Sequence, residues 1–231
     1  MYKVLRKDAP SDSPAAASSA DARDHQWTHV FRYRNVLLAI LGQLAWLTCL
    51  IVLTALFPNY LVDYLHLDVQ QMGFVLSAIG FGAVIGDLIL PGLSDRFGRK
   101  WVVVGAAASQ ILFVVLLMQA PANAAILFGL TFMVSLFNFG LITLTVGPLS
   151  ADSVPASLMS TASGFVIGVG EIFGGGIAPI IAGFVAHHYG IQYIFYLALG
   201  GLVIGLLAAH SLVETSSRQK SFEVLARQTP D

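Results

Sequence analysis

Long apolar stretches, separated by short polar breaks, fill the chain between residues 35 and 213. The breaks divide this region into six segments, at about residues 36–57, 72–91, 101–119, 125–148, 158–186 and 191–212. One bilayer crossing by a helix takes about 20 mostly apolar residues. No segment shows the alternation of a barrel strand, and lipid offers no hydrogen-bond partner to an open backbone. The pattern therefore predicts an all-α membrane protein with six transmembrane helices.

Proline-containing turns are expected to end three of these segments. They lie at residues 57–60, 91–92 and 147–148. Proline lacks the amide hydrogen that a helix interior uses, so it often marks the end of a helix. We therefore expect the first, second and fourth helices to stop there.

Composition supports the membrane assignment and excludes other classes. The 231 residues are 56% hydrophobic and 11% charged, with a mean hydropathy of +0.77, whereas a soluble domain is about 25% charged. Soluble enzymes and nucleic-acid-binding proteins are thereby excluded. Residues 1–34 and 214–231 are polar and have no apolar periodicity, which predicts a flexible leader and tail around a transmembrane domain at 35–213.

The basic residues predict the orientation. All twelve lysines and arginines lie before the first segment, between the second and third, or after the sixth. With six crossings, these positions share one side of the membrane. Basic loops stay in the cytoplasm, so both termini are predicted to be cytoplasmic.

The connection between the second and third segments carries a specific motif. Residues 92–100 read Gly-Leu-Ser-Asp-Arg-Phe-Gly-Arg-Lys. By charge alone this could be a basic loop that only sets topology. Its order, however, closely resembles the hallmark loop of the major facilitator superfamily, a family of transporters. The resemblance implies a cytoplasmic gate motif formed by Gly92, Asp95, Arg96, Gly98, Arg99 and Lys100. It implies a latch role for Asp95 and Arg99 against an opposite half, and a turn shaped by Gly92 and Gly98.

The resemblance covers about residues 30–214, which is one half of a family member that usually has twelve helices. The glycine-rich stretch 163–183 is similar to the C-terminal half, and weakly to members that carry organic anions with protons. This implies a proton-coupled transporter of a small organic solute in the bacterial cytoplasmic (inner) membrane. Alternating access would then require a complementary six-helix half or a second copy. The alternative is a non-transporting fragment or an accessory membrane subunit.

Two acidic residues lie inside predicted helices, where ionisable groups are more often functional than structural. Glu171 is near the middle of the fifth segment, among glycines at helical spacing, and is the first candidate for proton coupling. The alternative role is a hydrogen bond to a neighbouring helix. Asp87 is the second candidate, and we expect it to join a structural or gating network with Arg96 or Arg99, or with the ends of adjacent helices.

Three further side chains are candidates for lining a substrate cavity. They are Gln43 and Trp46 in the first segment and Asn138 in the fourth. Amides can hydrogen-bond a substrate, and they can equally bond a neighbouring helix.

The sequence gives little support to metal binding, catalysis or a channel function. No catalytic residue, cofactor or metal is predicted, since His187 and His188 lack further ligands at suitable spacing. A channel of the aquaporin type lacks its half-helix motifs, and a rhomboid-type protease is suggested only by Ser163 and His210.

Overall fold

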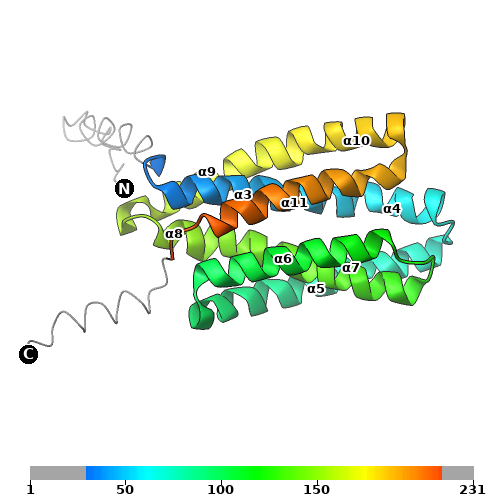
Figure 1. Cartoon of the computed structure of the whole chain (residues 1–231), viewed down its shortest axis with the longest axis horizontal. Helices are drawn as coiled ribbons and strands as arrows, with labels where there is room; N and C mark the ends of the chain where they lie inside the picture. Colours follow the sequence, from blue (N-terminus) through cyan, green and yellow to red (C-terminus); the bar gives the residue numbers. More distant parts are fainter. Residues whose placement is uncertain (1–29, 215–231) are drawn as a thin grey trace, which may run out of the picture.

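A computed structural model describes residues 30–214 of the chain (Figure 1). It contains six helices that are long and apolar enough to cross a membrane. They span Arg34–Tyr64, Val69–Phe97, Arg99–Met118, Ala124–Asp152, Ala156–Tyr189 and Ile191–His210. Within residues 30–214 no strand occurs. The predicted all-α class and the number of helices are confirmed. The division into leader, transmembrane domain and tail stays a prediction, and residues 1–29 and 215–231 of the predicted leader and tail lie outside the described residues.

Three of the six helices are continuous through π-helical turns. The first consists of α3 (Arg34–Ile51), η1 (Val52–Leu56), α4 (Phe57–Asn59) and η2 (Tyr60–Tyr64). The second and third are α5 (Val69–Phe97) and α6 (Arg99–Met118). The fourth joins α7 (Ala124–Leu144), η3 (Thr145–Leu149) and α8 (Ser150–Asp152). The fifth comprises η4 (Ala156–Leu158), α9 (Met159–Gly170), η5 (Glu171–Ile177) and α10 (Ala178–Tyr189). The sixth is η6 (Ile191–Tyr193) followed by α11 (Ile194–His210).

The expected helix ends at the three prolines are wrong. Pro58 follows the π-helical turn η1, Pro148 lies inside η3, and Pro91 lies inside α5. A wider turn can absorb the missing amide, and neighbouring helices support the freed backbone in an apolar environment. The helices therefore end at other residues. For example, α5 ends at Phe97, followed by Gly98, whose φ of +94° is rarely adopted by residues with an L side chain.

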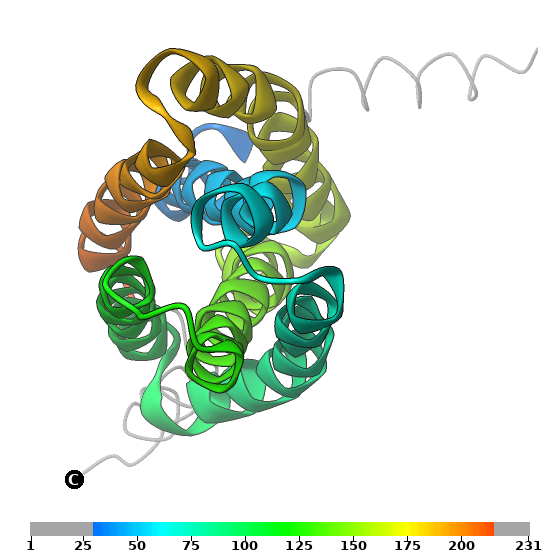
Figure 2. The ribbon, with the colours of Figure 1, turned by 90° about the vertical axis from the view of Figure 1, so that its right-hand side faces the viewer.

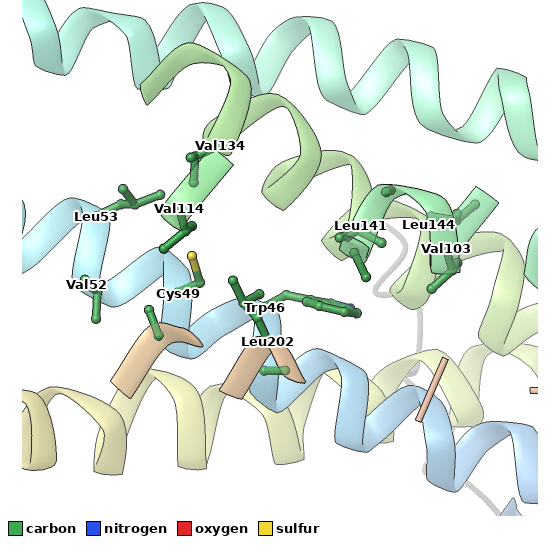
Figure 3. Packing of buried hydrophobic residues seen from close by; sticks show 14 of the residues in the cluster. Trp46, Cys49, Val52, Leu53, Val103, Val114, Val134, Leu141, Leu144 and Leu202 are labelled. Atoms are coloured by element: carbon green, nitrogen blue, oxygen red, sulfur yellow. The ribbon is translucent and has the colours of Figure 1, made fainter. Parts of the chain in front are cut away.

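The first helix forms the centre of the bundle. Of its most apolar stretch 61% is buried, against 28% for the second and fifth helices. Figure 2, which looks along the helices, shows it inside the ring of the others. In Figure 3 its side chains Trp46 and Leu53 pack beside Val134 and Leu141 of α7 and Leu202 of α11. Consequently α5 and the fifth helix lie at the periphery and keep large open faces.

Glycines bring α5 and α7 into backbone contact. A Cβ atom built on Gly82 would lie 2.6 Å from the carbonyl oxygen of Phe132, and one on Gly86 would overlap the carbonyl oxygen of Leu136. From the other side, a Cβ on Gly140 would lie 2.7 Å from the carbonyl oxygen of Gly86. Small residues at such positions are how membrane helices maximise van der Waals contact.

The first and last described residues meet at one end of the bundle. The Asn35 side-chain amide donates to the carbonyl oxygen of Val213 at 2.8 Å, and the Val213 amide donates to Asn35 Oδ1 at 3.0 Å. This end, on the left in Figure 1, also holds the loop around Gly98. We call it the basic end, because every lysine and arginine of residues 30–214 belongs to it. They are Arg32, Arg34, Arg96, Arg99 and Lys100.

Candidate functional site

Arg99 is the centre of a polar cluster at the basic end. Arg99 is the first residue of α6, and its side chain is 9% exposed. Its Nη1 donates to Asp95 Oδ1 at 2.9 Å and to Ser94 Oγ at 2.8 Å, both from the last turn of α5. Its Nε donates to Asp152 Oδ2 at 2.7 Å, at the end of the fourth helix. The planar guanidinium thus joins three helix ends with directed, charge-assisted bonds.

Glu214 connects the sixth helix to the same cluster. Its Oε1 accepts a hydrogen bond from the backbone amide of Arg99 at 2.8 Å, and its Oε2 accepts one from Lys100 at 3.1 Å. These amides belong to the first turn of α6 and have no partner within that helix. A carboxylate at a helix N-terminus is also favoured by the helix dipole. The basic end is therefore held by contacts that link four of the six helices.

Gly98 makes this arrangement sterically possible. Its φ is +94°, and a Cβ atom there would lie 2.8 Å from Glu214 Oε2. Gly98→Ala is expected to lower the free energy of unfolding by about 1–3 kcal/mol, because it combines backbone strain with displacement of the Glu214 carboxylate. Unfolding in detergent, followed by circular dichroism, measures the change. Gly92→Ala is the control, since beyond the backbone of its own helix no atom of residues 30–214 lies within 4 Å of a Cβ at that position. Equal stability of the two variants would contradict the assigned role of Gly98.

Asp87 lies on the exposed side of α5. Its Oδ1 accepts a hydrogen bond from Thr143 Oγ1 at 2.6 Å, which ties α5 to α7. The expected pairing of Asp87 with Arg96 or Arg99 is wrong, since Arg99 is engaged by Asp95 and Asp152. Among residues 30–214 no cation forms an ion pair with Asp87. Its carboxylate is left on an open helix face with one neutral partner.

Glu171 lies on the exposed side of the fifth helix, where it begins the π-helical turn η5. The opposite side of this helix is closed, because Gly170 and Gly174 pack directly against Gln43 and Leu47 of α3. The glutamate is also without an ion-pair partner in the described part of the chain. A π-helical turn within an α-helix often marks a functional position.

Each of these acids shares its helix face with small residues at helical spacings of three, four or seven. On α5 the face contains Gly73, Ser77, Gly80 and Asp87, and on the fifth helix Gly164, Gly168, Glu171 and Gly175. We call these the two acidic faces. Apart from the Glu171 carboxylate beside Gly175, no atom of residues 30–214 lies within 4 Å of a Cβ built on their glycines.

Comparison with known proteins identifies the family of the chain. The family model for the Major Facilitator Superfamily matches residues 4–167 and again residues 38–229. The chain belongs to the major facilitator superfamily. It is thus an integral, multi-pass membrane protein of a transporter family, as the loop at 92–100 indicated.

Curated relatives of this superfamily member are named as transporters. A gentisate transporter of Corynebacterium glutamicum is 31% identical over 159 residues, 68% of this chain and 35% of the relative. The inner membrane metabolite transport protein YhjE of Escherichia coli is 30% identical over 59% of this chain and 32% of its own length. The probable galactarate/D-glucarate transporter GudP of Bacillus subtilis is 28% identical over 68% and 35%. The chain spans about a third of the length of these relatives, and none is named as an enzyme.

Only some residues of the superfamily motif at 92–100 lie as the sequence predicted. Asp95 and Arg99 come together, and Gly98 forms the turn. Gly92 does not, because it lies inside α5, so its predicted role in the turn is wrong. Arg96 is exposed, and Lys100 contributes its backbone amide to Glu214.

Sequence reasoning missed the three groups that hold Arg99 and the helix start beside it, namely Ser94, Asp152 and Glu214. Asp152 carried a signal, because it is a lone acid at the end of an apolar segment. An even number of crossings places that end on the side of the basic loop, where a carboxylate would meet a cation.

The three cavity candidates lie in the interior of the bundle. Trp46 Nε1 donates to Thr145 Oγ1 at 3.2 Å, and Asn138 Oδ1 accepts from Gln110 Nε2 at 2.6 Å. Gln43 is buried against Gly170. Asn138 thus bonds a neighbouring helix, whereas Gln43 Oε1 has no hydrogen-bond partner within residues 30–214. The role of these residues in lining a cavity stays a prediction.

Proposed function

We propose that this chain is one six-helix half of a proton-coupled transporter that carries a small organic acid across the bacterial cytoplasmic membrane. In this proposal the basic end and both termini face the cytoplasm, consistent with the positive-inside rule. A second six-helix bundle covers the two acidic faces. It is either a complementary half or a second copy of the chain.

The exposure of Glu171 within an apolar helix is the observation that carries this proposal. An ionised carboxylate facing lipid at mid-membrane costs about 2.5–3.5 kcal/mol on insertion scales. Glu171 lies near the centre of the 34-residue helix Ala156–Tyr189, far from either polar end. Such a residue is stable when it faces a water-filled cavity or other protein. The same argument applies to Asp87 on α5, so both acidic faces are assigned to the transport pathway.

The two acidic faces also suit contact with a second bundle. Their glycines would let another helix approach closely. Asp95, whose side chain is 65% exposed despite its bond to Arg99, can contact that bundle at the basic end. Alternating access in this class of transporter consists of rocking one bundle against the other around a midplane site. The contacts around Arg99 would keep this half together as it moves.

The substrate class follows from the relatives and from the charges. Two of the relatives above are named for the acids gentisate and galactarate/D-glucarate. Between residues 101 and 213 the chain has no lysine or arginine, so the cation that binds a substrate carboxylate would belong to the second bundle. In this half, Glu171 would carry the proton that accompanies the acid.

Glu171→Gln is expected to abolish coupling while transport continues down the substrate gradient. A glutamine preserves the shape of the side chain but cannot release a proton. The assay is uptake of labelled gentisate into proteoliposomes that contain the chain and a second bundle. A pH gradient of one unit can drive about tenfold accumulation per proton, and this accumulation should be lost in the variant. Asp63→Asn, an exposed acid beyond the apolar stretch, is the control and should keep it.

Two other results would change the proposal. Full pH-driven accumulation in Glu171→Gln would remove this residue from proton coupling. Absence of uptake with every second bundle tested would favour the non-transporting fragment or accessory subunit.

A further inference from the structure

A cavity lined by aromatic side chains lies at the end of the bundle opposite the basic end, the end that faces the viewer in Figure 2. Its volume is about 190 Å³. It is formed where η2, the end of α6 and the start of the sixth helix meet. The aromatic residues around it are Tyr60, Tyr64, Tyr193, Phe195 and Tyr196. Met118 and the amide of Gln192 complete the lining. None of these side chains belongs to the acidic faces or to the cluster around Arg99.

The rings of this pocket are held in place by one another. Tyr60 and Phe195 are each 2% exposed and meet edge to face, with ring centroids 5.0 Å apart. Tyr64 stacks on Tyr60 at 5.1 Å, and Tyr193 lies 5.8 Å from Tyr196. The floor of the pocket is therefore part of the packed core. Its walls, Tyr64, Tyr193 and Tyr196, are between 45% and 61% exposed.

The electrostatics of the pocket favour a cation. No lysine or arginine lines it, and every such residue of the described chain is at the other end of the bundle. The nearest ionisable acid along the chain is Asp63, which lies between Tyr60 and Tyr64 in η2 and is exposed. Aromatic faces are the negative side of the ring quadrupole. An anion would find no countercharge among the lining residues, whereas a cation would lie among several aromatic rings.

The volume of the cavity and its aromatic lining restrict the class of ligand that it can bind. Sites for drug-sized ligands occupy about 300–1,000 Å³, so this cavity suits a single small group. Aromatic cages of this kind bind quaternary ammonium groups. The rings themselves would hold such a group, because a quaternary ammonium has no N–H to donate to the tyrosine hydroxyls. We infer that the tyrosine pocket binds an alkylammonium group, supplied either by a lipid headgroup or by a free amine.

The test measures binding of choline to the full chain in nanodiscs of phosphatidylglycerol, by saturation-transfer NMR. The neutral probe 3,3-dimethyl-1-butanol has the shape of choline without the charge, and we expect it to bind at least about fivefold more weakly. The double variant Tyr193→Leu/Tyr196→Leu should lose choline binding. Tyr193→Phe/Tyr196→Phe keeps the rings and should retain it. Because both positions are exposed, neither double variant removes a core side chain.

The outcomes separate the two sources of the ligand and can overturn the inference. Weaker choline binding in nanodiscs with added phosphatidylethanolamine would identify the lipid headgroup as the occupant, and unchanged binding would identify a free amine. Equal binding of choline and its neutral analogue would show a merely apolar pocket and refute the inference. Unchanged choline binding in the leucine double variant would refute it as well. Transport activity plays no part in these measurements.

Discussion

Arg99→Met is expected to lower the free energy of unfolding by about 3 kcal/mol. Breaking a buried ion pair by removing one partner costs about 3–5 kcal/mol, because the other charge is left without compensation. The lower value applies here, since Asp95 is largely exposed and can be hydrated. The main cost falls on Asp152, whose side chain is 25% exposed and 2.7 Å from Arg99 Nε. Methionine fills much of the space, so the loss is one of charge and hydrogen bonds.

The stability of Arg99→Met is measured by unfolding in detergent micelles, against Arg96→Met as the matched control. Arg96 is in the same loop, is exposed, and has no ion pair within residues 30–214. Adding Asp152→Asn to Arg99→Met should restore part of the stability, because it removes the uncompensated charge. Arg99→Lys should fall between the wild type and Arg99→Met, since an ammonium cannot reproduce the three directed bonds. Equal effects of Arg96→Met and Arg99→Met would show that the cluster does not stabilise the fold.

Gly86→Ala is expected to be the second severe substitution, with a loss of at least about 2 kcal/mol. Its Cβ would overlap the carbonyl oxygen of Leu136, which is backbone and cannot rotate away. The α5–α7 contact would have to open along its length, and overpacking of this kind costs about 1–3 kcal/mol or more. Reversible unfolding followed by circular dichroism measures the difference.

Gly80→Ala is the control for this substitution. Gly80 lies six residues earlier on α5, on the acidic face, where no atom of another described helix is within 4 Å of a Cβ. Alanine favours a helix over glycine by about 1 kcal/mol, so this variant should be as stable as the wild type or more stable. A destabilisation as large as that of Gly86→Ala would mean that glycine content, and not helix contact, stabilises α5.

The helix ends illustrate where local patterns mislead in a membrane protein. Pro58, Pro91 and Pro148 predicted turns, because proline breaks helices in water. In the structure all three lie within continuous helices, two of them associated with π-helical turns. An apolar surrounding penalises an open backbone more than it penalises a distorted helix. A proline in the sequence therefore does not by itself show whether a membrane helix ends or continues in a distorted form.

At the candidate site, too, some contacts could be predicted from local sequence and others could not. The chemistry of Asp95 and Arg99 could be predicted from their order in a short loop, and they lie only four residues apart. Asp152 and Glu214 follow 53 and 115 residues after Arg99, and no local pattern joins them to it. The partner of Asp87 proved to be Thr143, an ordinary residue of an apolar helix.

The sequence by itself determined the number of helices, the side on which the basic residues gather, and the superfamily. These follow from transfer of apolar segments into lipid and from a short contiguous motif, which are properties of neighbouring residues. Only the tertiary structure decided that Gln43, Trp46 and Asn138 are buried, that Glu171 and Asp87 lie on open faces, and that five aromatic rings enclose a pocket. Each of these features depends on which side of a helix faces another helix. The rotation of each helix about its own axis is set by packing between residues that are far apart in the sequence.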